Sequence, residues 1–306
     1  MILSDRKQGS LLGLAIGDAL GCTLEFKKPG TFERITTIEG GGVHQLKPGQ
    51  WTDDTSLALC LAQSLIDCKG FDPKDQMTKY CKWEAEGYMS STGSCFDIGN
   101  STLKALDKFR ATGDPYAGST EEHSAGNGSI MRLAPIPMYY AHSPKDALHF
   151  AALSSKTTHA NEMCVDACRY MAGIIVGLLN GENKETVLSK MYSPVNNYFD
   201  GNPICRSLRE IVNGSFKNKQ PPKIKGTGFV LKSLEAALWA FHTTNNFKEG
   251  ALKAVNLGYD ADTTGAVYGQ IAGSCYGIDN IPRKWVEIIY MKENIIELSN
   301  KLNLLP

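Results

Sequence analysis

Apolar residues recur at the spacing of an α-helix along most of this chain, while strict period-2 alternation is confined to very short stretches. This pattern constrains the fold more than any other feature, because half-buried strands would need the alternation that is missing. It predicts helices over residues 7–20, 54–68, 161–179, 229–241, 247–257, 263–276 and 283–302. A small β element is expected only at residues 34–38. We therefore expect an all-α fold, a compact orthogonal bundle of many helices.

Nothing in the sequence marks a boundary between two domains. The 306 residues are enough for two average domains or for one large one. The glycine run at residues 40–42 and the stretch at 217–228 are typical of loops, and no internal repeat is found. Small residues in the first predicted helix, Gly9, Gly13, Ala15 and Gly17, allow a second helix to pack closely against it. We expect a single domain over residues 1–306.

The charge and cysteine content exclude several classes of partner. The chain has 32 Lys and Arg against 32 Asp and Glu and no long basic run, so nucleic acid is not an expected partner. The longest apolar stretch, near residues 171–179, is too short to cross a bilayer. The nine cysteines include no C-x-x-C pair, and Cys164, Cys168 and His159 leave a structural zinc set incomplete. With no secretory signal pattern at the start, we expect reduced thiols, a cytoplasmic location and no membrane partner.

Two acidic clusters carry the strongest chemical signal. The first, WTDDT at residues 51–55, stands where a loop enters the helix predicted over 54–68. The second, DADTT at residues 260–264, stands at the start of the helix predicted over 263–276. Either cluster could simply cap its helix, but a cap needs one side chain and each cluster offers two carboxylates beside threonines.

Brought together, these carboxylates would repel one another unless a cation compensated their charge. Hard oxygen ligands of this type suit Mg²⁺, Mn²⁺ or Ca²⁺ better than Zn²⁺. Two such clusters could hold a pair of ions roughly 3.5–4 Å apart, an arrangement that activates water for hydrolysis. Considered together, the clusters favour a metal site over two separate helix caps.

Three further patches are less specific, and each has a simpler explanation. Glu25 follows a small-residue segment at 17–21 and is either a cleft carboxylate or a solvated surface group. The loop SAGNGS at residues 124–129 could turn its backbone N–H groups toward a diphosphate, or it could be a plain turn before a helical run over 130–140. Asp97 stands just before a predicted helix, where an N-cap is the simpler role.

As an ordered set, these motifs resemble the ADP-ribosylglycohydrolase family, which includes the glycohydrolase that activates dinitrogenase reductase and the hydrolases of ADP-ribosyl-arginine and ADP-ribosyl-serine. The set comprises GDALG at 17–21 with Glu25, WTDDT at 51–55, FDIGN at 96–100, GNGS at 126–129 with Met131 and Arg132, and DADT at 260–263. The motifs occur in the order of the family and cover nearly the whole chain. One departure is Gly258-Tyr259, where the family usually has Gly-Gly, and it bears on specificity at the rim of the cleft.

The resemblance implies an all-α fold with two Mg²⁺ or Mn²⁺ ions at the base of a cleft. The implied metal ligands are Thr52, Asp53, Asp54, Asp260, Asp262 and Thr263. The implied catalytic residues are Asp97, beside the ribose at the scissile bond, and Glu25, at the metal-side edge of the cleft. The implied substrate-binding residues are Gly126, Asn127, Gly128 and Ser129 at the diphosphate, His159 at the ligand and Phe229 against the adenine. For His159 and Phe229, a purely structural role remains the simpler alternative.

The resemblance also implies a reaction, the hydrolysis of the bond between the ribose anomeric carbon and a protein side chain through an oxocarbenium-like transition state. Asp97 or Glu25 would act as acid/base or stabilise the developing charge. An arginine N-glycosidic linkage is favoured, since the FDIGN segment is more similar to the bacterial arginine-directed members. Serine-linked or other O-linked ADP-ribose stays open as the substrate.

Two other classes of function also stay open at this point. A non-catalytic relative that binds ADP-ribose would be expected to lack some metal carboxylates, whereas all four aspartates are present here. A different two-metal hydrolase, such as a phosphatase, would not require the other motifs. The expected partners are an ADP-ribosylated protein as substrate and ADP-ribose as product, and the expected form is a monomer.

Overall fold

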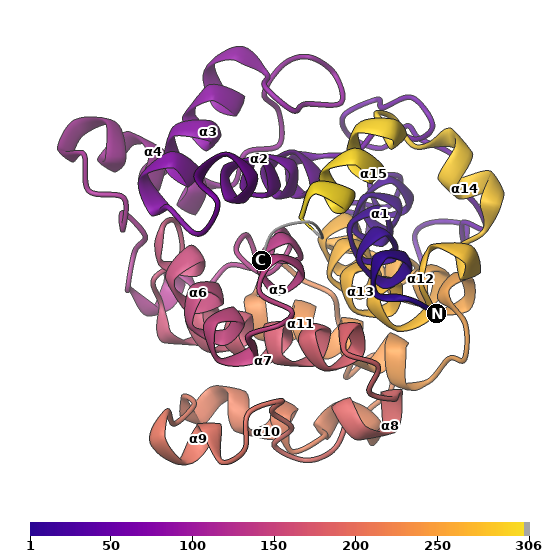
Figure 1. Ribbon diagram of the computed structural model, residues 1–306. Coiled ribbons are helices and arrows are strands. Elements are labelled where there is room, and N and C mark those ends of the chain that lie inside the picture. Colours follow the sequence, from indigo (N-terminus) through magenta and orange to yellow (C-terminus); the bar gives the residue numbers. More distant parts are fainter. Residues whose placement is uncertain (303–306) are drawn as a thin grey trace.

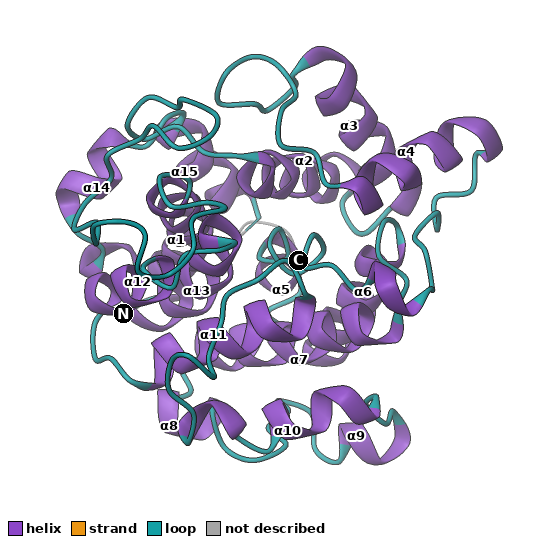
Figure 2. Cartoon of the chain, turned by 180° about the vertical axis from the view of Figure 1, so that it is seen from behind, coloured by secondary structure: helices purple, strands orange, loops and turns teal. Residues whose placement is uncertain are grey.

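In the computed structural model, residues 1–302 are described, and residues 303–306, at the end of the predicted domain, lie outside the described part. The larger helices are α1 (Leu3–Gly21), α2 (Asp53–Cys68), α3 (Pro73–Glu86), α4 (Asn100–Thr112), α6 (Pro144–Lys156), α7 (Glu162–Leu179), α11 (Val230–His242), α12 (Phe247–Val255), α13 (Ala261–Tyr276) and α15 (Lys292–Lys301). The shorter helices are α5 (Pro135–Tyr139), α8 (Lys184–Val187), α9 (Tyr198–Gly201), α10 (Arg209–Val212) and α14 (Arg283–Ile288). Figure 2 shows helices and loops but no strand in the described residues, which confirms the all-α prediction.

The centre of the fold is the antiparallel pair α1 and α13, which pack side by side (Figure 1). Glycines spaced four residues apart on the two helices face one another, so that a Cβ added at Gly13 would lie 2.3 Å from the carbonyl oxygen of Gly269. At the end of α1, a Cβ at Gly21 would lie 2.3 Å from the Cα of Asp262, at the start of α13. The backbones therefore touch, as the small residues of the first helix predicted. This contact brings the chain leading to Glu25 against the second acidic cluster.

Gly269→Ala is expected to lower the free energy of unfolding by about 1–3 kcal/mol, because the added methyl group overpacks two touching helices. A Cβ at Gly269 would lie 1.9 Å from the carbonyl oxygen of Gly13. The matched control is Gly201→Ala in α9, where a Cβ meets no atom within 4 Å. Urea denaturation compares both variants with the wild type. Equal stability of Gly269→Ala and the wild type would contradict the close contact.

The remaining helices surround this pair. α7 is buried along nearly its whole length, as its apolar sequence predicted. The main hydrophobic core extends from Leu11 in α1 to Leu302, and a smaller cluster between α2, α3 and α4 contains Tyr80, Trp83 and Leu106. The short helices α8, α9 and α10 form a strip along the outer side of α7 and α11, at the bottom of Figure 1. In the described part of the chain, no helix is both long and apolar enough to cross a membrane.

Two local predictions were wrong. Residues 34–38 form no strand, and the backbone N–H of Ile35 donates instead to the side chain of Asn256. The helix expected over residues 130–140 is reduced to α5, because residues 128–132 form turns. Pro135 and Pro137 both lack the backbone N–H that a helix continuing from residue 130 would need.

The helix predicted over residues 283–302 is also wrong as a single element, since it is broken into α14 and α15. Met291 has a φ of 53°, which ends one helix before the next begins. The backbone N–H of Tyr290 donates to the carbonyl of Gly49 at 3.0 Å, and Trp51 donates its indole N–H to the carbonyl of Tyr290 at 3.3 Å. The break therefore anchors the loop that precedes the first acidic cluster.

Candidate metal and catalytic site

One cavity of about 520 Å³ collects most of the predicted site residues from both ends of the chain. The predicted residues that line it are Glu25, Asp53, Asp54, Asp97, Gly126, Asn127, Gly128, His159, Asp260, Asp262 and Thr263. The predicted residues that do not line it are Thr52, Ser129 and Phe229. The two acidic clusters therefore meet in space although about 200 residues separate them in the sequence.

Asp18, to which the sequence analysis assigned no role, holds the first acidic cluster in place. It is fully buried in α1 and accepts hydrogen bonds from the backbone N–H groups of Thr52 (2.9 Å) and Thr55 (3.1 Å). The hydroxyl groups of the same two threonines donate to it at 3.0 and 2.6 Å. Because Thr52, the N-cap of α2, makes no side-chain cap of its own, Asp18 supplies the cap from another helix. Burial raises the pKa of Asp18 to about 6, although these hydrogen bonds oppose the rise.

Threonine hydroxyls bridge the two acidic clusters. Thr263 of α13 donates to Asp54 Oδ1 at 3.3 Å, and the hydroxyl of Thr52 lies 3.5 Å from Asp262 Oδ2. Burial, together with neighbouring carboxylates, raises the pKa values of Asp53, Asp54 and Asp262 well above their ordinary value. Asp54 Oδ2 and Asp262 Oδ1 are buried without a hydrogen-bond partner among the described residues. Buried carboxylate oxygens without donors are costly unless a cation compensates them, so this donor set fits a divalent ion.

The loop at residues 126–128 lies between the second acidic cluster and His159. Asn127 Nδ2 donates to Asp260 Oδ2 at 2.7 Å, which ties the loop to the start of α13. Gly128 lies against the imidazole of His159, where an added Cβ would be 2.7 Å from Cε1. This position therefore needs glycine because the histidine ring occupies the space of a side chain.

Residues behind the loop fix it from the side facing away from the cavity. The Ser129 hydroxyl is buried and accepts hydrogen bonds from the Ser155 hydroxyl at 3.0 Å and from Cys168 Sγ at 3.4 Å. Cys164 Sγ donates to the carbonyl of Gly126 at 3.2 Å. All nine cysteines are free. Cys164 and Cys168 thus support the loop as thiols, and the side chain of Ser129 does not reach the cavity.

His159 forms an uncharged polar wall of the cavity. It is buried, and its Nδ1 lies 2.8 Å from the hydroxyl of Thr158, to which Arg132 donates at 2.5 Å. Burial, reinforced by the charge of Arg132, lowers the pKa of His159 to about 3. Phe229 is exposed and lines a neighbouring cavity together with Met163 and Leu231, and its place against the adenine stays a prediction.

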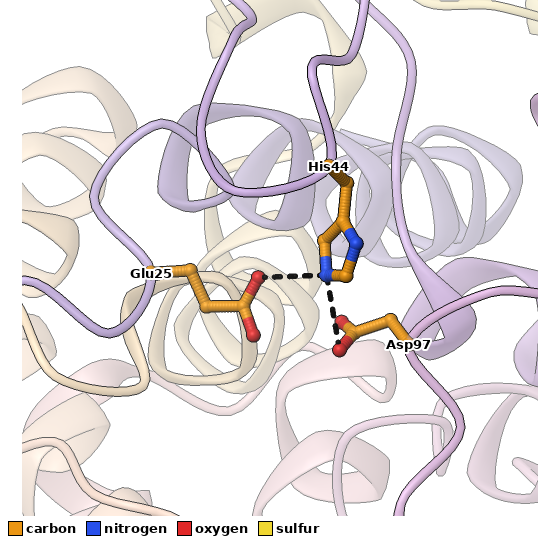
Figure 3. A group of neighbouring side chains, drawn as sticks. All are labelled: Glu25, His44 and Asp97. Carbon is orange, nitrogen blue, oxygen red and sulfur yellow. Dashed lines mark ion pairs between the residues drawn. The ribbon is translucent and has the colours of Figure 1, made fainter.

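A histidine that the sequence analysis missed lies between the two candidate catalytic carboxylates. His44 Nε2 lies 3.1 Å from Asp97 Oδ1 and 3.4 Å from Glu25 Oε2, and Figure 3 shows the imidazole directed at both carboxylates. Burial and the charge of Asp97 raise the pKa of Glu25 to about 9. Burial also raises the pKa of Asp97 to about 6, although His44 opposes that rise. The only sequence signal for His44 is the preceding glycine run, in which Gly42 lies so close to the end of α1 that a Cβ would be 2.0 Å from the carbonyl oxygen of Cys22.

Three residues of the cavity wall, Phe26, Asp97 and Tyr259, have backbone conformations that are uncommon outside glycine. Asp97 has a φ of 58° and is not a helix cap, because α4 begins at Asn100 with Gly99 as its N-cap. Such conformations cluster at functional sites. Tyr259 has a φ of 57°, and its backbone N–H donates to the carbonyl of Lys27 at 2.8 Å. Glycine adopts this conformation freely, whereas the tyrosine here adds a side chain to the cavity wall.

Comparisons with known proteins agree on one family. A family model described as ADP-ribosylglycohydrolase matches residues 1–306. The chain is 40% identical over 302 residues to ADP-ribosylarginine hydrolase Tri1 of Pseudomonas putida (strain GB-1), covering 97% of this chain and 78% of that protein. It is 30% identical over 295 residues to the ADP-ribosyl-[dinitrogen reductase] glycohydrolase of Rhodospirillum rubrum, covering 94% of this chain and 91% of that protein. A solved structure described as an ADP-ribosylglycohydrolase-related protein complex matches with a TM-score of 0.86 at 42% identity, covering 99% of this chain and 98% of that chain.

Proposed function

Because the chain belongs to the ADP-ribosylglycohydrolase family, we propose that it hydrolyses the bond between ADP-ribose and an arginine side chain of a modified protein. The observation that carries this proposal is a cavity in which the two buried acidic clusters, the carboxylates of Glu25 and Asp97, and the 126–128 loop meet. The similarity to a protein named as an ADP-ribosylarginine hydrolase supports the arginine linkage.

The two acidic clusters are the proposed site of divalent cations, with Mg²⁺ or Mn²⁺ expected. The proposed ligands are Thr52, Asp53, Asp54, Asp260, Asp262 and Thr263. The Thr52 hydroxyl donates its hydrogen to Asp18, which leaves oxygen lone pairs for an ion. The unpartnered oxygens of Asp54 and Asp262 support the fit. When bound, such ions supply positive charge that activates water and orients the ribose hydroxyls.

The chain's own residues would hold the two ends of the substrate. The 126–128 loop and the neutral His159 are proposed to contact the diphosphate part of ADP-ribose. Glu25 and Asp97 are proposed to flank the scissile bond, where their carboxylates face the positive charge that develops on the ribose ring. A guanidinium leaving group is a planar cation that matches carboxylates, whereas a serine hydroxyl carries no charge. The acidic character of this end of the cavity therefore favours an arginine linkage.

The linkage is tested by comparing two peptides of equal length, one with ADP-ribose on an arginine and the other with ADP-ribose on a serine. Released ADP-ribose is quantified by chromatography in the presence of Mg²⁺ or Mn²⁺. We expect release from the arginine-linked peptide. Release from the serine-linked peptide alone would overturn the linkage, and release of inorganic phosphate instead of ADP-ribose would overturn the reaction class.

His44→Ala is expected to lower kcat/KM about tenfold, a loss of about 1.4 kcal/mol of transition-state stabilisation, mainly through kcat. Without the imidazole, the carboxylates of Glu25 and Asp97 repel each other and move from their positions at the scissile bond. Steady-state kinetics on the arginine-linked peptide measure the effect. His44→Gln should recover part of the loss, since its amide can again donate to a carboxylate. His142→Ala, at an exposed loop position, is the control and should leave the kinetics unchanged.

A further inference from the structure

A second cavity, of about 660 Å³, adjoins the proposed catalytic cavity and has the opposite charge. The two cavities share Asn100 and Ser101. The catalytic cavity is lined by one glutamate and five aspartates against a single lysine. The second cavity, here called the lysine groove, is lined by Lys104 and Lys108 of α4 and by Lys156 at the end of α6.

The positive charge of the lysine groove is not compensated by the protein. None of its three lysines forms an ion pair within residues 1–302, whereas Arg110 on the same helix pairs with Glu84 and Asp107. The one acidic residue of the groove, Glu121, lies 2.9 Å from His123. Because the chain as a whole has a formal net charge of +0, this local excess marks a surface suited to an anionic partner.

The groove meets the catalytic cavity at Asn100 and Ser101, at the start of α4. Asn100, Lys104 and Lys108 are spaced four residues apart and therefore share one face of α4. With a rise of 1.5 Å per residue, this row is about 12 Å long, which matches about four residues of an extended chain. Asp97 lies three residues before Asn100, the first residue of the row. A protein chain that leaves the catalytic cavity along α4 would pass both lysines within about four residues of its modified side chain.

We propose that the lysine groove binds an acidic segment of the ADP-ribosylated protein, within about four residues of the modified arginine. This inference rests on the function proposed above. The three lysines of the groove attract acidic side chains, so the charge distribution favours the passage of such a segment along α4. Complementary charge of this kind sets partner choice and the rate of encounter.

The test uses two ADP-ribosyl-arginine peptides that differ only in carrying glutamates or glutamines at the positions flanking the arginine. We expect the kcat/KM of the wild type to be about tenfold higher for the glutamate peptide than for the glutamine peptide. Each exposed ion pair contributes little free energy, but up to three lysines contribute together. Raising the ionic strength should reduce this preference. The triple variant Lys104→Gln/Lys108→Gln/Lys156→Gln should hydrolyse both peptides equally. Absence of the preference in the wild type, or its persistence in the triple variant, would overturn the inference.

The control variant is Lys145→Gln/Lys248→Gln/Lys284→Gln, which removes the same charge from exposed positions of α6, α12 and α14 and should keep the preference. Fluorescence anisotropy with the unmodified peptides measures the groove without the reaction. Tighter binding of the glutamate peptide by the wild type than by the groove variant, with no ADP-ribose released from either modified peptide, would support the groove and overturn the proposed function. Equal binding by the two proteins would overturn the groove.

Discussion

Asp54→Asn is expected to reduce the release of ADP-ribose from an arginine-linked substrate by about 1000-fold, because losing a cation ligand removes several kcal/mol of transition-state stabilisation. The carboxylate is almost fully buried, accepts a hydrogen bond from Thr263 at 3.3 Å and keeps one oxygen without a partner. Asparagine preserves the shape of the side chain and removes its charge. Steady-state release with Mg²⁺ or Mn²⁺ measures the loss. Asp200→Asn, on the exposed surface of α9, is the matched control and should retain full activity.

The same variant should be more stable than the wild type once a chelator has removed divalent ions. Burial and the charges of Asp18 and Asp53 raise the pKa of Asp54 well above its ordinary value, which means that the fold disfavours its ionised form. Removing the charge should therefore raise the midpoint of thermal unfolding, by about 2–4 °C for each kcal/mol gained. Added Mg²⁺ or Mn²⁺ should raise the midpoint of the wild type much more than that of the variant. A less stable variant in the presence of chelator would contradict the proposed crowding of buried charge.

Asp18→Ala is expected to lower the free energy of unfolding by about 3–5 kcal/mol. Four donors converge on this buried carboxylate, the backbone N–H and hydroxyl groups of Thr52 and Thr55, and the change leaves them without their acceptor. Urea denaturation measures the loss. Asp18→Asn should cost less, because the amide keeps the shape and one acceptor oxygen. Asp67→Ala, at a half-exposed position near the end of α2 with an ion pair to Lys79 at 2.9 Å, is the control and should stay within about 0.5 kcal/mol of the wild type.

Asp18→Ala should also lower the metal-dependent activity, although Asp18 does not line the catalytic cavity. Its carboxylate fixes the first turn of α2, and that turn carries Asp53 and Asp54. The kinetic loss should therefore coincide with a smaller stabilisation of the protein by Mg²⁺ or Mn²⁺. Wild-type stability together with wild-type activity would show that Asp18 does not anchor the first acidic cluster.

Features that depend on local pattern could be predicted from the sequence. The apolar periodicity located α1, α2, α7 and α11 to within a few residues, because each of these helices buries an apolar face in the core. The small residues of the first helix predicted its close packing, and the glycines of α13 are its partners. The two acidic clusters meet because each begins a helix beside the C-terminal end of α1. The metal site could be predicted only when both clusters were considered together, since either cluster alone is explained by a helix cap.

Features that depend on contacts between distant segments could not be predicted in this way. Nothing local to His44 indicates that its loop lies against Glu25 and Asp97. In the sequence, Asp18 is only a polar residue within an apolar helix. Its role becomes visible from the hydrogen bonds that Thr52 and Thr55 donate to it. The break at residues 289–291 likewise follows from a hydrogen bond to a loop more than 200 residues away. The side chain of Ser129 likewise does not line the cavity, because its hydroxyl is hydrogen-bonded to Ser155 and Cys168 of two other helices.

The most direct test of the proposed function is the release of free ADP-ribose from an ADP-ribosyl-arginine protein by the wild type, measured with Mg²⁺ or Mn²⁺ and again after addition of a chelator. We predict release that stops with the chelator and returns when the ion is restored in excess. Release that continues at the same rate in the chelator would contradict the metal site formed by the two acidic clusters. No release under any of these conditions, from a protein that still binds ADP-ribose, would contradict the proposed hydrolase activity on arginine.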